Sequence, residues 1–165
     1  MIIIKIWYHI CCLLRKALFK LIYGRKFLFG RFVTWRKGFS LMIEKNAEVK
    51  IGNSCFFNNY CSIAANNSVE IGDGCLFGEN VKIYDHNHRF NKKMPIKEQG
   101  FSNGEVHIGQ NCWIGSNVTI LKGANIGDNC VIGAGCVVSG RISAESLVKI
   151  DKSSYVTEDI KYYKS

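Results

Sequence analysis

The sequence predicts an all-β fold made of short strands separated by sharp bends, with one long loop and a helix ahead of the strands. The main observation is a large apolar residue at every sixth position, which glycine follows at seven places. A period of six fits neither a helix, with a period of about 3.6, nor a strand that alternates every second residue. It fits bends that each turn one large side chain inward and need a small residue beside it. The apolar positions are Ile51, Phe57, Ile63, Ile71, Phe77, Ile83, Ile108, Ile114, Ile120, Ile126, Ile132 and Val138.

Residues 1–30 form a basic segment with the pattern of an amphipathic helix. Nine Lys and Arg residues and no acidic residue precede Glu44, so residues 1–43 carry the whole net charge of +9. Such a helix is typical of a peripheral contact with an anionic membrane surface, and equally of packing on the domain or on a partner subunit. No recognised nucleic-acid module accompanies the charge, so nucleic acid is not expected as a partner. The apolar face consists of Ile10, Leu13, Leu14, Ala17, Leu18, Leu21 and Ile22.

The first residues and the cysteines predict a reducing, cytoplasmic location, either free or peripheral at the inner membrane surface. Residues 1–14 are apolar, but Lys5 interrupts them and Arg15 ends the run before the ~20 residues that a spanning helix needs. Six of the eight cysteines lie four places after a stepping residue. Because buried free cysteine behaves as a small hydrophobe, we expect inward-facing thiols rather than disulfides or metal ligands. These six are Cys55, Cys61, Cys75, Cys112, Cys130 and Cys136.

Residues 31–143 are expected to form one repeat domain, and residues 144–165 a C-terminal segment. The length of 165 residues suits a single core. Between Ile83 and Ile108 the step of six is replaced by an interval of 25 residues. Residues 84–107 are therefore expected to leave the repeat as a loop, and the stretch "YDHNHRF" places His86 and His88 at its start.

The run "VHIGQNCWIGSNVTILKGANIGDNCVIGAGCVVSG", residues 106–140, resembles the hexapeptide-repeat acyltransferases. Specifically, it resembles the sugar O-acetyltransferases of the galactoside, maltose and capsular or O-antigen polysaccharide type. It covers roughly residues 40–141. It implies a left-handed parallel β-helix, which the repeats would fill with about four coils, and a homotrimer with active sites between subunits. It also implies acetyl-CoA as co-substrate, a carbohydrate acceptor and no metal.

The resemblance assigns the catalytic role to a loop histidine, which removes the proton from the acceptor hydroxyl. Alignment of "NVKIYDHNHRF" with the family favours His88 over His86 for this position. Imidazole suits the task because its neutral form accepts a proton near neutral pH. Asp85 or a loop carbonyl is expected to orient the ring and select its tautomer.

The resemblance also implies acceptor-binding and coenzyme-binding positions. Asn66 stands where the sugar enzymes have an acidic residue, and the family's C-terminal G-x-P-A segment is absent. The backbone N–H of Ser116 corresponds to the group that holds the thioester oxygen, and Arg141 is a candidate partner for a CoA phosphate. The acceptor positions are Asn58, Asn66 and Trp113, and the coenzyme positions are Ser116, Ala134, Ser139, Gly140 and Arg141.

The leading hypothesis is therefore an acetyl-CoA-dependent O-acetyltransferase that acts on a sugar hydroxyl of a surface polysaccharide or its precursor. One alternative is a metal-dependent hydratase of the carbonic anhydrase type on the same fold, for which His86, His88 and His107 are the histidines of the repeat domain. Another is a non-catalytic trimeric scaffold in which the loop histidines have no role.

Overall fold

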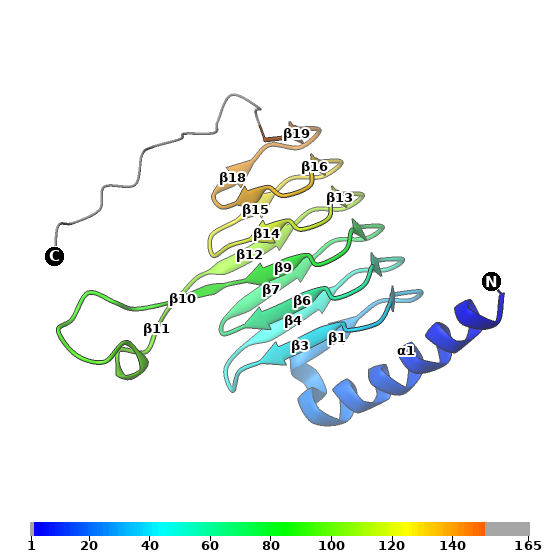
Figure 1. Ribbon diagram of the computed structural model, residues 1–165, viewed down its shortest axis with the longest axis horizontal. Coiled ribbons are helices and arrows are strands. Elements are labelled where there is room, and N and C mark those ends of the chain that lie inside the picture. The colour runs from blue at the N-terminus through cyan, green and yellow to red at the C-terminus, as the bar shows by residue number, and fades with distance from the viewer. Residues whose placement is uncertain (1, 151–165) are drawn as a thin grey trace, which may run out of the picture.

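The structure is a computed structural model that describes residues 2–150 of the chain. It begins with helix α1 (Ile2–Tyr23) and a short 3-10 helix η1 (Gly24–Lys26), which lead into a stack of short strands. Figure 1 shows the stack as a tapering prism, with α1 beneath its first coil and a hairpin projecting from its middle. The C-terminal segment expected over 144–165 lies outside the described residues from position 151 onward.

The prism has three parallel sheets, one on each side, and the chain visits them in turn. The first sheet contains β1 (Phe27–Phe29), β4 (Glu48–Ile51), β7 (Ser68–Ile71), β12 (Glu105–Ile108), β15 (Asn125–Ile126) and β18 (Arg141–Ile142). The second sheet contains β2 (Thr34–Trp35), β5 (Phe56–Phe57), β8 (Leu76–Phe77), β13 (Trp113–Ile114), β16 (Val131–Ile132) and β19 (Leu147–Val148). The third contains β3 (Ser40–Ile43), β6 (Ser62–Ala65), β9 (Lys82–Tyr84), β14 (Thr119–Ile120) and β17 (Val137–Val138).

This arrangement is the left-handed parallel β-helix that the resemblance implies. The predicted count of about four coils is wrong, because six strands stack in the first sheet and strands extend from Phe27 to Val148. The count began at Ile51 and took the residues before it as ragged partial coils, because the interval of ten from Leu41 to Ile51 interrupts the step of six. Register nevertheless places Trp35 under Phe57 and Leu41 under Ile63.

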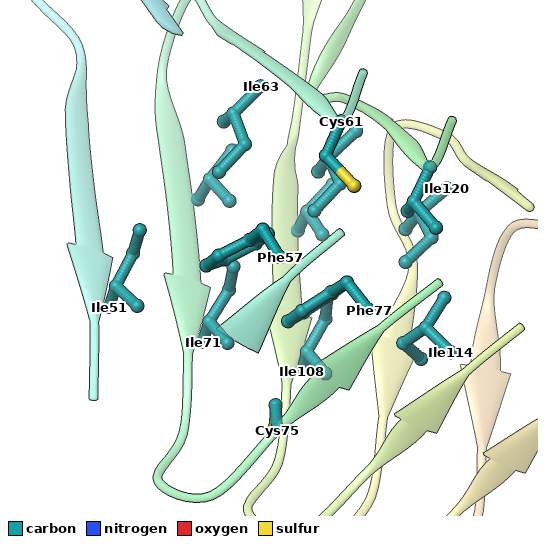
Figure 2. Close-up of a cluster of buried hydrophobic side chains, with 14 of the residues drawn as sticks. Ile51, Phe57, Cys61, Ile63, Ile71, Cys75, Phe77, Ile108, Ile114 and Ile120 are labelled. Atoms are coloured by element: carbon teal, nitrogen blue, oxygen red, sulfur yellow. The ribbon is translucent and has the colours of Figure 1, made fainter. Parts of the chain in front are cut away.

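The stepping residues form continuous buried columns inside the prism. Ile51, Ile71 and Ile108 stack along one side, and Figure 2 shows this column beside that of Phe57, Phe77 and Ile114. The rings of Phe57 and Phe77 lie 4.3 Å apart and nearly parallel. The sharp bends use left-handed backbone at the residue before the small inward side chain, where asparagine is tolerated, as at Asn80, Asn111, Asn117 and Asn129.

The six repeat cysteines are buried, as expected from their register, and none is in a disulfide. Their thiols donate to carbonyl groups of the next coil; the Cys55 and Cys75 Sγ atoms lie 3.1 Å from the oxygens of Gly72 and Gly109. Burial raises the pKa of the Cys61 thiol to about 11. These contacts explain how a polar thiol replaces an aliphatic side chain in the core.

Thiol reactivity tests this packing. In folded protein at about pH 8, a disulfide reagent should react quickly with Cys11 only, because Cys11 alone among the eight thiols is not buried and the reagent cannot reach a buried sulfur. Unfolding in denaturant should expose all eight. The Cys11→Ser variant should lose the fast phase. Rapid loss of several thiols from the folded protein would contradict the inward register.

Helix α1 covers the end of the core at the first coil. The Phe19 ring lies 5.9 Å from the Trp35 ring and 6.3 Å from the Phe39 ring. Tyr23 Oη donates to the carbonyl of Leu41 over 2.9 Å, and Arg15 Nη1 to that of Phe39 over 3.1 Å. Over residues 2–150 the structure contains no helix long and apolar enough to cross a membrane.

The packed side of α1 is not the predicted apolar face. Cys12 is buried against the prism, whereas Ile10, Leu13, Leu14, Leu18, Leu21 and Ile22 are exposed. The expectation that this face packs on the domain is therefore wrong. The reason is that Phe19 and Tyr23 lie on the other side of α1 and fit the aromatic end of the core.

Candidate active site

The candidate site begins where the chain leaves the prism after β9. Asp85 is the turning residue, and the segment that follows forms an antiparallel hairpin of β10 (His86–His88) and β11 (Phe101–Asn103) before β12 resumes the coil. Figure 1 shows this hairpin extending sideways from the third coil. A loop was expected at this place, but the strand pairing at its base was not.

Asp85 anchors the base of the hairpin. Its carboxylate is completely buried and accepts hydrogen bonds from the backbone N–H groups of Asn66, at 2.8 and 3.0 Å, and Asn67, at 2.7 Å. Its carbonyl accepts from the Gly104 N–H at 2.7 Å, so both strands of the hairpin are tied to the same residue. A buried carboxylate is stable here because these donors replace its hydration.

The Asp85 carboxylate also contacts His86. The distance from Asp85 Oδ1 to His86 Nδ1 is 2.9 Å, and the His86 side chain is 20% exposed. In the neutral ring this contact places the proton on Nδ1 and leaves Nε2 as an acceptor. The sequence identified Asp85 as a partner for the loop histidine, but expected it beside His88.

His88 lies on the same side of β10 as His86, two residues further along the hairpin. Its ring centre is 4.6 Å from that of Phe101, which also meets His86 edge-on at 5.1 Å. The His88 side chain is exposed and makes no hydrogen bond to other residues between 2 and 150. Phe101 was missed by the sequence analysis because only the hairpin register, which pairs it with His88, brings it to the site.

The base of the hairpin is braced by neighbouring coils. The Asn66 side chain donates to Asn103 Oδ1 over 2.8 Å, and Lys122 Nζ donates to Ser102 Oγ over 2.7 Å. The structure thus brings Asn66 next to the histidine hairpin. The position of β10, and with it the direction of both histidines, is held by contacts with two other coils.

The remaining candidates divide between two edges of the prism. The edge between the third and first sheets carries the histidine hairpin and Asn66, with Ser139 and Gly140 further up and Arg141 at the start of β18. The edge between the second and third sheets carries Asn58, Ser116 and Ala134, and Trp113 lies in the adjoining strand β13. Within one chain the third sheet separates these two edges, so the predicted residues do not form a single cluster.

On the second edge, Trp113 has an exposed side chain and Ser116 is half-buried. The Trp113 side chain is exposed although it lies in a strand, because it points away from the core. Ser116 Oγ accepts from the N–H of Glu79 at 3.1 Å, while the backbone N–H of Ser116 makes no hydrogen bond within residues 2–150. An unpaired N–H at an edge can hold a developing oxyanion.

The histidines of the repeat domain are not gathered around a common point. His107 lies on the first sheet, with its Nδ1 3.8 Å from Glu70 Oε2. Across the part of the chain that the structure describes, no group of three or more His, Cys, Asp and Glu side chains is placed to hold a metal ion.

Comparison with known proteins finds a transferase family model and acetyltransferase relatives. The family model for bacterial transferase hexapeptide (six repeats) matches residues 105–140. A putative lipopolysaccharide biosynthesis O-acetyl transferase, WbbJ, of Escherichia coli (strain K12) is 32% identical over 99 residues, which are 55% of this chain and 50% of WbbJ. The chain spans between 22% and 50% of the length of curated relatives that it matches.

Two solved structures resemble this chain over most of its length. A maltose O-acetyltransferase from Clostridium difficile 630 is 30% identical with a TM-score of 0.61, covering 78% of this chain and 67% of that one. A galactoside acetyltransferase in complex with coenzyme A is 27% identical with a TM-score of 0.68, covering 91% of this chain and 78% of that one.

Proposed function

Because the chain belongs to the family of bacterial transferases with hexapeptide repeats, we propose that it transfers an acetyl group from acetyl-CoA to a sugar hydroxyl. The acceptor we propose is a unit of a surface polysaccharide or its precursor. The observation that carries the proposal is the histidine hairpin, which interrupts an otherwise regular prism and is anchored by the buried Asp85. The relatives described above include sugar and lipopolysaccharide O-acetyltransferases, and their names support this choice of acceptor.

His88 is the proposed general base. It is exposed and its ring nitrogens are not engaged by other described residues, so an incoming hydroxyl can reach it. The Nδ1 of His86 already faces Asp85, and the contact between them fixes the base of the hairpin that presents His88. His86 is accordingly a positioning residue in this proposal.

The reaction follows from these groups. His88 accepts the hydroxyl proton while the oxygen bonds to the thioester carbon, and the Ser116 N–H stabilises the negative oxygen that forms. The carbon–sulfur bond then breaks, and the imidazolium returns its proton to the departing CoA sulfur. The products are the O-acetyl sugar and CoA.

The division of the candidates between two edges supports a homotrimer with sites between subunits. The His88 edge of one copy facing the Trp113 edge of the next would bring the base, Asn66 and Arg141 to the same groove as Asn58, Ser116 and Ala134. Within a single chain, the third sheet keeps these two sets of residues on separate edges. The assembly therefore explains why exposed groups on separate sides of one prism serve one reaction.

Donor binding tests the proposal directly. Calorimetric titration with acetyl-CoA should show saturable binding near one molecule per chain, and CoA without the 3′-phosphate should bind more weakly if Arg141 pairs with that phosphate. Arg141→Ala should weaken acetyl-CoA binding by about tenfold, because a charge-assisted contact is lost. Arg25→Ala, which removes the same charge near α1, is the matched control and should bind normally. Absence of binding at millimolar ligand would overturn the assignment.

A further inference from the structure

The outward face of α1 is an apolar surface that no other residue between 2 and 150 covers. The side chains of Leu14 and Leu21 are 67% and 83% exposed, and four further apolar residues between Ile10 and Ile22 lie beside them. On the opposite side of the helix, Phe19 packs on Phe39 and Trp35 in the first coil. A contiguous exposed apolar face of this kind marks an interaction surface.

The bends of the prism change from acidic in the third coil to basic in the first coil, next to α1. Register stacks Arg31 under Asn53 and Asp73 at one bend, and Lys37 under Asn59 and Glu79 at the next. Each column is basic in the first coil, neutral in the second and acidic in the third. Because asparagine occupies the same bends one coil away, the fold itself does not require the basic side chains.

Exposed aromatic residues accompany the charge. Phe32, next to Arg31, is 80% exposed and has a φ of 59°, which is unfavourable for a bulky side chain. Trp7 and Tyr8 line a groove of about 530 Å³ between α1 and the first coil, whose rim carries Arg15, Arg36 and Lys37. Aromatic and cationic side chains around an apolar stripe match the chemistry of the lipid headgroup region.

We propose that the outward face of α1 and the basic bends of the first coil form a docking surface for an anionic phospholipid bilayer. The apolar side chains would enter the boundary of the acyl chains, while Arg31, Arg36 and Lys37 meet lipid phosphates. A second copy of the chain is disfavoured as the occupant, because a twofold contact through this surface would set the same cationic residues against one another. This proposal is independent of the acetyl-transfer reaction.

The first test is flotation of the full chain with vesicles. The protein should float with phosphatidylcholine vesicles that contain about 30% phosphatidylglycerol, and stay behind with pure phosphatidylcholine. Raising the salt from about 0.1 to about 0.5 M should reduce the bound fraction severalfold, because the phosphate contacts are screened.

Two variants separate the apolar and the charged contributions. Leu14→Gln with Leu21→Gln should lower vesicle binding by at least about tenfold, while Leu147→Gln at the other end of the prism, which alters a similarly exposed leucine, should not. Arg31→Asn with Lys37→Asn adopts the residues found one coil away and should lower binding similarly. Lys92→Asn with Lys93→Asn removes equal charge from the hairpin and should leave binding unchanged.

Two results would overturn the proposal. One is equal binding to neutral and anionic vesicles, which would remove the role of the basic bends. The other is no flotation of the unmodified protein together with a smaller mass by light scattering for the Leu14→Gln, Leu21→Gln variant. That result would assign the face to contact between copies of the chain.

Discussion

Replacing His88 with alanine is expected to lower kcat for acetyl transfer by about 10²- to 10⁴-fold, the usual contribution of a general base. The affinity for acetyl-CoA and the melting temperature should change little, because the His88 side chain is exposed. The measurement is release of CoA thiol with a panel of galactoside, glucoside and polysaccharide acceptors. Cys11→Ser is a suitable background, since it removes the accessible thiol from the assay.

The neighbouring residues provide the comparison. His86→Ala should lower kcat less than His88→Ala, and Asp85→Asn should also lower the melting temperature, because the buried carboxylate accepts several N–H groups at the base of the hairpin. If His86→Ala instead removes activity while His88→Ala keeps it, the base is His86 with Asp85 as its orienting partner. If the double variant turns over normally, neither histidine is the base.

Replacing Gly72 with alanine is expected to destabilise the protein by ~3 kcal/mol, the upper part of the range for overpacking. A Cβ at Gly72 would lie 2.6 Å from Gln110 N and 2.7 Å from Gly109 C, both backbone atoms of the next coil. Stacked coils hydrogen-bond through their backbones, so neither strand can move aside without losing its ladder. Thermal unfolding followed by circular dichroism should show a melting temperature lower by about 10 °C.

Gly133 is the matched control, because it follows a stepping residue in a later coil. A Cβ there would meet only Val148 O at 3.1 Å, and its other neighbours lie beyond 3.4 Å. Gly133→Ala should therefore cost about 1 kcal/mol or less. Equal destabilisation by both substitutions would mean that loss of glycine, rather than contact with the next coil, governs stability.

Much of the prism was predictable because its rules are local. Each bend needs a small residue beside a large inward one, and the same need recurs at every coil, so Ile108, Ile114 and Ile120 could be placed in the core from spacing alone. The first coil escaped the count because its return to the first sheet is longer, and only backbone pairing places Trp35 beneath Phe57.

The hairpin shows the limit of spacing arguments. A break in the repeat marks a loop, but not how the loop folds. The partner of Asp85 depends on how the backbone turns into β10, and the structure gives it His86. The register of β10 and β11 in turn packs Phe101 on both histidine rings. Asn58 and Asn66 likewise lie on different edges of the prism because the coil has three sides and the third sheet runs between them.

By itself, the sequence determined the repeat, its inward side chains, the position of the loop and the existence of a basic amphipathic helix, because each depends on neighbours a few residues away. Only the tertiary structure decided which side of that helix is buried. The packed side of α1 combines aromatic with basic residues, because Lys16 lies over the Trp35 ring and Lys20 donates to the Phe27 carbonyl. The aromatic end of the core made the choice, since Phe19 fits against Trp35 and Phe39 and leaves the leucine face outside.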